Sequence, residues 1–362
     1  MNSAEIPWRA VVATVLASIA AGCGDAPVAP GAGQDAAVAP GVGARELDDA
    51  ADAIETLLDA GRTREAWLVA EKLLARVPEG DAAERKAAEM AARAAFAHAE
   101  LGRAALAPGE RARLLEAAAD AAERSARADG ARDAARLRFA ALLADRAGRG
   151  ARADELHDLA LLAAPDDLES LSVAAAASIA RGDLERARAL VARHRAAAPG
   201  GTPAAGWSRA LAAELALAEG DAAAARAAAA EAFALDRDSL EFRVLLARAL
   251  RADGAPREAA VLLGALQPAE RSRRAVAEPL AAALADLGEH ARAAAAWRDA
   301  VAGSPEEPRV RGELALALVR AGDRDAAAVV LAELESMRGG RAERARVDAV
   351  LRKEREEGDA PR

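Results

Sequence analysis

Residues 280–305, LAAALADLGEHARAAAAWRDAVAGSP, contain the landmarks that decide the fold. Leucines at helical spacing precede Gly288, and Ala293 follows five residues after it. Because glycine accepts the left-handed conformation in which many helices end, Gly288 predicts the end of one helix and the start of another. Pro305 closes the stretch and stops the second helix. The pattern predicts two antiparallel helices that approach each other closely at the alanine.

The same landmarks recur along the chain at a nearly constant interval. Six turn glycines are separated by 34, 38, 34, 34 and 34 residues, and each is followed five residues later by an alanine. The 38-residue interval contains residues 200–203, where we expect a longer loop between repeats. Such a period is typical of solenoids built from stacked helix pairs. The glycine and alanine pairs are Gly148 with Ala153, Gly182 with Ala187, Gly220 with Ala225, Gly254 with Ala259, Gly288 with Ala293 and Gly322 with Ala327.

This register, with prolines at Pro165, Pro199 and Pro305, resembles the tetratricopeptide repeat (TPR). The resemblance implies an all-α fold, a right-handed α-solenoid of about eight TPR-like helix pairs over residues 45–338. In the irregular region 79–133 we expect one lengthened pair with a long helix over 108–128. Residues 339–362 would supply a charged helix that covers the last apolar face of the solenoid.

Composition agrees with thin, closely packed layers of helices. Apolar residues make up 53% of the chain, chiefly alanine, whereas aromatic residues make up 2% and tyrosine is absent. Alanine favours helices and occupies little volume, so helices can pack closely without a wide core. A net charge of −9 makes nucleic acid a poor partner.

The first 22 residues differ from the rest of the chain. Arg9 precedes the uncharged residues 10–21, which end in small side chains. Twelve helical residues rise only about 18 Å, well short of the roughly 30 Å hydrocarbon core of a bilayer. We therefore predict a secretory signal peptide over residues 1–22. If this stretch is not a signal, the protein is a cytoplasmic TPR scaffold.

The residues Ala20, Ala21, Gly22 and Cys23 resemble the lipobox of bacterial lipoproteins, which implies that Cys23 is lipidated and becomes the mature N-terminus. A non-lipidated signal peptide cut near Ala21 is the alternative. Because Cys23 is the only cysteine, an internal disulfide or a metal site built on cysteine pairs is excluded.

The residues after the lipobox have the composition of a linker. Residues 23–44 are rich in Gly, Ala and Pro, which predicts a flexible tether with a reach of about 25 Å. By resemblance, Gly24 after the cysteine implies sorting to the outer membrane of the bacterial cell envelope, with the protein facing the periplasm.

Signatures of enzymes are missing from the sequence. It has neither a phosphate-binding Gly-rich loop followed by Lys and Ser or Thr nor a Gly-x-Ser-x-Gly elbow. His157 and His194, on second helices of consecutive repeats, are expected to pack rather than to bind metal. The sequence therefore predicts no catalytic residue, no metal and no cofactor.

A binding groove is implied by the TPR resemblance, because first helices normally line the concave face of the solenoid. Arg248 and Arg251 lie one turn apart and are suited to a partner carboxylate. Trp207 is either an anchor for a partner or packs under the loop at Gly200. The expected groove residues are Arg138, Leu142, Trp207, Glu214, Glu241, Val244, Arg248, Arg251, Glu278 and Arg309.

These features predict a non-enzymatic scaffold, lipid-anchored in the envelope, that recruits or assembles other envelope proteins through its groove. An alternative is an envelope protein that binds or hydrolyses a small molecule or glycan in the groove. That alternative requires a compact polar pocket.

Overall fold

The computed structural model describes residues 42–80, 83–102, 106–128, 130, 132–337 and 339–358. These residues form helices joined by short connections, and none of them lies in a strand, which confirms the all-α prediction. The predicted signal peptide, Cys23 and most of the predicted tether lie outside this part of the chain. Within it, every helix is too short or too polar to cross a bilayer.

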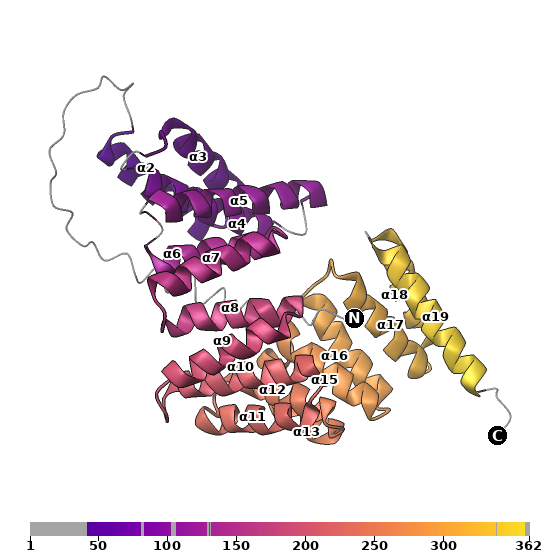
Figure 1. Ribbon diagram of the computed structural model, residues 1–362. Coiled ribbons are helices and arrows are strands. Elements are labelled where there is room, and N and C mark those ends of the chain that lie inside the picture. The colour runs from indigo at the N-terminus through magenta and orange to yellow at the C-terminus, as the bar shows by residue number, and fades with distance from the viewer. Residues whose placement is uncertain are drawn as a thin grey trace. The chain divides into compact units, whose positions relative to one another are not determined.

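The chain divides into two compact units, and unit 1 ends at Ala197. Its helices pack in consecutive pairs, each against the next along the chain (Figure 1). The predicted long helix in the irregular region is present as α5. The helices are α2 (Ala44–Asp59), α3 (Thr63–Arg76), α4 (Glu84–Leu101), α5 (Pro108–Ala128), α6 (Ala134–Arg146), α7 (Gly150–Ala163), α8 (Leu168–Arg181) and α9 (Leu184–Ala197).

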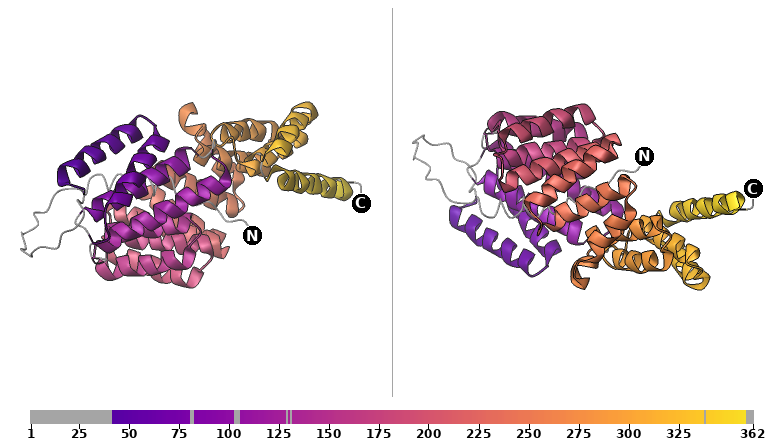
Figure 2. Two further views of the ribbon diagram at one scale, coloured as in Figure 1. Left: turned by 90° about the horizontal axis from the view of Figure 1, so that it is seen from above. Right: turned by 90° about the horizontal axis from the view of Figure 1, so that it is seen from below.

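Unit 2 begins at Ala198 and ends in a charged helix. That helix, α19, packs on α17 and α18, and its C-terminal part extends beyond them (Figure 2). The described residues thus form eight helix pairs, the short α14 and the terminal α19. The helices of unit 2 are α10 (Pro203–Glu219), α11 (Ala222–Leu235), α12 (Leu240–Ala252), α13 (Pro256–Gly264), α14 (Pro268–Arg271), α15 (Arg274–Asp286), α16 (His290–Ala302), α17 (Pro308–Arg320), α18 (Arg324–Ser336) and α19 (Gly340–Gly358).

The turns between paired helices follow the predicted register. All six turn glycines have positive φ, from 72° at Gly288 to 83° at Gly322. The side chain of Asp221 accepts a hydrogen bond from the amide of Ala224 and so caps the start of α11. The alanines five residues after the glycines are all buried, which confirms that they lie where the helices approach closely.

The four extra residues in the 38-residue interval are not in a loop, contrary to our expectation. Residues 198–202 connect α9 to α10, the same length as the connection over 303–307. The extra residues lengthen α10, which has 17 residues where α12 and α15 each have 13. Pro203 explains the difference, because its fixed φ suits the first turn of a helix and starts α10 early.

The second helix of the sixth pair is shorter than its neighbours. Helix α13 has nine residues, whereas α11 has 14 and α16 has 13. Pro268 begins the one-turn α14, and a proline there prevents α13 from continuing. Arg271, which the register placed at the end of the second helix, therefore lies at the end of α14.

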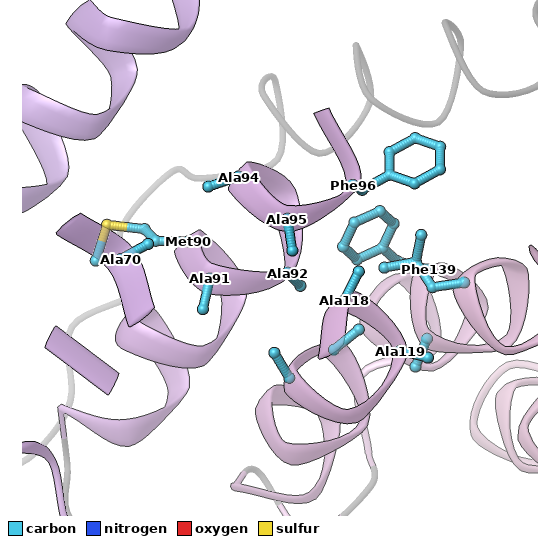
Figure 3. Close-up of a cluster of buried hydrophobic side chains, with 14 of the residues drawn as sticks. Ala70, Met90, Ala91, Ala92, Ala94, Ala95, Phe96, Ala118, Ala119 and Phe139 are labelled. Atoms are coloured by element: carbon cyan, nitrogen blue, oxygen red, sulfur yellow. The ribbon is translucent and has the colours of Figure 1, made fainter. Parts of the chain in front are cut away.

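Alanine forms much of the core of unit 1 (Figure 3). Ala91, Ala94 and Ala95 are fully buried on different sides of α4, which packs against α2, α3 and α5. Small side chains on several sides allow one helix to be surrounded closely. Phe96 and Phe139 supply the bulk in this cluster.

Candidate functional site on the first helices of unit 2

The first helices of neighbouring pairs in unit 2 lie against one another. Helix α10 contacts α12, α12 contacts α15, and α17 contacts α19. We call the exposed sides of α10, α12, α15 and α17 the first-helix face. This face is where the TPR resemblance places a binding groove.

A series of ion pairs crosses the first-helix face from one helix to the next. The two partners of each pair are 31 to 35 residues apart, about one repeat, so they occupy similar positions in neighbouring first helices. The ion pairs are Glu214 with Arg248 at 2.6 Å, Asp286 with Arg251 at 2.6 Å, Glu278 with Arg309 at 2.7 Å and Glu313 with Arg346 at 2.8 Å.

The two arginines predicted to bind a partner carboxylate are already paired within the chain. Arg248 Nη1 donates to Glu214 Oε1, and Arg251 Nε donates to Asp286 Oδ2. The charge of each guanidinium is therefore compensated, although its other N–H groups keep the capacity to donate. The expectation of two uncompensated cations was wrong, because each arginine finds its carboxylate one repeat away rather than among its neighbours in sequence.

Trp207 lies on the first-helix face and keeps 42% of its surface exposed. Its ring meets the buried ring of Phe242 edge to face, with centroids 5.0 Å apart and an interplanar angle of 69°. Glu214 is two turns further along the same side of α10, so the exposed indole and the Glu214–Arg248 pair belong to one surface. The half-exposed, laterally supported indole is suited to an apolar contact.

Gly206 makes the support of Trp207 possible. A Cβ atom at residue 206 would lie 2.9 Å from Phe242 Cε2, so only glycine allows α10 to approach Phe242 this closely. The same position faces Leu235, 3.8 Å from such a Cβ, and Leu235 is itself exposed. The sequence analysis missed Gly206 and Phe242. Phe242 could have been found, because it follows Trp207 by 35 residues, about one repeat.

Arg138, in unit 1, is not a surface residue as predicted. It is only 4% exposed, and its guanidinium pairs with Asp167 at 2.7 Å and Glu169 at 2.5 Å. Leu142 and Val244, also expected on the groove, are buried as well. These three positions face the packed side of their helices, so the register taken from the family was displaced there.

The histidines predicted to pack are indeed inside unit 1. His157 and His194 are both buried. Burial lowers the pKa of His194, and burial is also the main cause of the lowered pKa of His98. Within the described residues, no group of three or more His, Cys, Asp or Glu side chains could hold a metal ion.

The two best-defined hollows among the described residues are open to solvent and largely apolar in their lining. One, of about 470 Å³, lies on α12 and α13 in unit 2. The other, of about 380 Å³, is lined by Arg132, Leu159, Leu162 and Ala163 in unit 1. Neither is the compact polar pocket that binding or hydrolysis of a glycan would require.

No protein-family model matches the sequence, and no curated protein matches it. Solved structures do. A tetratricopeptide repeat protein from Parabacteroides merdae is 12% identical, with a TM-score of 0.56 over 76% of this chain and 99% of that one. Yeast Tom70 is 14% identical, with a TM-score of 0.57 over 82% of this chain and 60% of its own.

A third similar structure is the Cut9–Hcn1 hetero-tetramer of the APC/C, which is 14% identical with a TM-score of 0.51. The match covers 84% of this chain and 56% of that one, so this chain spans less than two thirds of both Tom70 and this structure. The fold is that of a tetratricopeptide-repeat protein. The helix pairs and the turn glycines described above agree with that class.

Proposed function

We propose that the protein is a non-enzymatic scaffold that holds an extended segment of a partner protein on the first-helix face of unit 2. The observation that carries this proposal is the exposed Trp207. Aromatic residues are scarce in this chain, yet this one is presented to solvent and supported by Phe242. Trp and Arg dominate the residues that contribute most to binding at protein interfaces.

The chemistry of the first-helix face favours a partner that is apolar at one point and hydrogen-bonding elsewhere. Trp207 and Leu235 offer exposed apolar surface. Beside them, the partly exposed Arg248 and Arg251 have N–H groups beyond those used in their ion pairs. An extended segment presents free backbone carbonyls that can accept from them. Because the arginine charges are compensated, the partner does not need a strong negative charge.

Photo-crosslinking tests this proposal directly. A photoreactive amino acid in place of Trp207 should capture a specific partner in cells, and mass spectrometry would identify the partner and the contact. The matched control is the same amino acid in place of Val329, which is 59% exposed on the second helix α18. The same captured proteins at both positions, or no capture at position 207, would contradict binding at the first-helix face.

We also propose that lipid on Cys23 tethers the scaffold to the bacterial envelope, where it recruits or assembles other envelope proteins on the periplasmic side of the outer membrane. The lipobox resemblance, the preceding apolar stretch and the following Gly- and Pro-rich residues support this tether. A Cys23→Ser variant should leave the membrane fraction and lose a metabolic acyl label, whereas Ser18→Ala should keep both. Wild-type protein without acyl label would exclude the anchor.

A further inference from the structure

Helix α11 is unusually poor in bulky side chains. Its sequence is AAAARAAAAEAFAL, with ten alanines among fourteen residues. A second helix of this kind covers little of the first helix that follows it, since alanine reaches only one carbon from the backbone. The following first helix is α12, which packs against α11.

An apolar hollow of about 470 Å³ lies next to this alanine helix (Figure 1). Leu246 and Leu250 of α12 line it together with Val261 and Leu262 of α13. The two equivalent leucines of the next first helix, Leu280 and Leu284, are both buried in a core cluster with leucines of α13.

Leu246 is only half-buried, and Val261 is 68% exposed, the largest exposed fraction of any bulky apolar side chain in the described part of unit 2. Exposed aliphatic surface of this kind in a hollow is a feature of docking sites.

The charge at the rim of the hollow is positive once the ion pairs are counted. Glu258 lines the rim and pairs with Arg226, which also pairs with Asp253 at 3.0 Å. Arg257 lines the rim too, and no ion pair joins it to any residue that the structure describes. The rim therefore offers one uncompensated guanidinium beside four aliphatic side chains.

We propose that this hollow docks an acidic amphipathic helix of a partner protein. Apolar grooves between helices accept helices whose apolar side chains recur at i, i+3, i+4 and i+7. A carboxylate one turn from those anchors would complete the charge of Arg257, and Arg with carboxylate is the geometry that gives strong paired hydrogen bonds. The surface is separate from Trp207, so this docking site is independent of the proposed function.

A second copy of the chain is a poorer occupant than another protein. The most acidic described helix, α2, has the apolar side chains of Leu47, Ala51 and Ile54 buried within unit 1. To dock in the hollow of another copy it would have to leave that core. A partner that supplies its own helix has no such cost.

The test uses the full chain with Cys23→Ser and three fluorescent peptides of about 20 residues, a length at which helices form more readily. One peptide carries leucines at i, i+3, i+4 and i+7 with glutamates on the flanks, the second has lysines in place of the glutamates, and the third is a scramble of the first. Fluorescence anisotropy should show that the acidic peptide binds at least about tenfold more tightly than the other two. Equal binding of the acidic and basic peptides, or no binding of any peptide, would overturn the proposal.

Variants then locate the binding. Val261→Glu should weaken binding of the acidic peptide by about tenfold or more, and Arg257→Ala by about threefold to tenfold. The control Val329→Glu changes an equally placed valine, seven residues after its turn glycine, and should change nothing. Trp207→Ala should likewise leave the affinity unchanged, which separates this site from the first-helix face.

Two further outcomes would also overturn the proposal. The first is an equal loss of binding in Val261→Glu and Val329→Glu, which would mean nonspecific contact. The second is a concentration-dependent dimer, seen by sedimentation, that Val261→Glu abolishes, which would make a second copy the occupant. Circular dichroism of each variant confirms that it is folded.

Discussion

Unit 1 and unit 2 share one repeat pattern, but they place polar side chains differently. Among the described residues, unit 1 buries nine polar or charged side chains and unit 2 buries two. Buried polar groups must find partners inside the protein, so unit 1 depends on specific pairings. Those of unit 1 are Thr63, Glu84, His98, Ser125, Arg138, His157, Ser170, Ser178 and His194, and those of unit 2 are Ser208 and Ser304.

The difference teaches that one repeat register can use charge in two ways. In unit 1, Arg138 lies inside, between α6 and the start of α8, and holds two carboxylates. In unit 2, Arg251 performs a similar bridge from α12 to α15 but remains on the surface. Interior pairing makes a unit rigid and sensitive to pH, whereas surface pairing leaves a face that a partner can contact.

The largest effect should come from removing the buried arginine. Arg138→Ala leaves Asp167 and Glu169 without their cation and should lower the free energy of unfolding by about 3 kcal/mol. The matched change Arg251→Ala, at an exposed pair, should cost less than about 1 kcal/mol. Chemical denaturation followed by circular dichroism measures both. Equal costs would remove the distinction between the two units.

A bulky residue at a close helix contact should be the next most damaging change. Ala225 is fully buried where α10 and α11 approach, so Ala225→Leu should destabilise unit 2 by about 2 kcal/mol through overpacking. Ala227→Leu, two residues away on the exposed side of α11, is the control and should be nearly neutral. If Ala225→Leu is also neutral, packing in unit 2 is looser than its buried alanines indicate.

Acid should weaken unit 1 through His194. Because burial lowers the pKa of His194, the unfolded chain binds a proton more readily than the folded one. The free energy of unfolding should therefore fall as pH drops below about 6.5, at a cost of about 1.4 kcal/mol for each unit by which the pKa is lowered. Hydrogen exchange at pH 7.5 and 5.5 should show the loss in unit 1.

The variant His194→Leu is the control for the pH effect. It places leucine where the equivalent positions of two other repeats have Leu266 and Leu334, so it should stabilise unit 1 and reduce the pH dependence. His98, whose pKa is also lowered by burial, would account for what remains. An unchanged pH dependence in His194→Leu would show that His194 is not responsible.

The smallest effect is expected at two glycines of unit 2. Gly254 has a φ of 75°, so Gly254→Ala should cost about 1 kcal/mol. Gly264 lies in α13, where a Cβ atom would meet open space, so Gly264→Ala should gain about 0.5 kcal/mol. Thermal unfolding compares the two. A loss in both would mean that Gly264 has a role in ending α13.

The sequence predicted the fold well because its landmarks are local. A turn glycine such as Gly220 and the alanine five residues later act within one helix pair, so their spacing alone specifies the turn and the close contact. Pro268 shows where that reading failed. The register placed the end of a second helix near Arg271, but a proline three residues earlier stopped α13 and started α14.

The candidate site was harder to predict than the fold, because it depends on contacts between repeats. The sequence marked Trp207 and Arg248 by residue type, whereas Phe242 and Asp286 became visible only as their partners. Arg138 was misplaced for a related reason. Its burial follows from the acidic start of α8, about 30 residues away, and not from its own neighbours in sequence.

The ion pairs of the first-helix face also fix the order in which the repeats can occur. Glu214 and Arg248 are 34 residues apart, so they occupy one register position with opposite charge. A duplication of the α12–α13 pair would place Arg248 beside a copy of itself, and like charges would repel where an attraction now lies. Each repeat in this unit is thus matched to its own neighbours, and the array cannot be lengthened by simple copying of one member without a compensating change of charge.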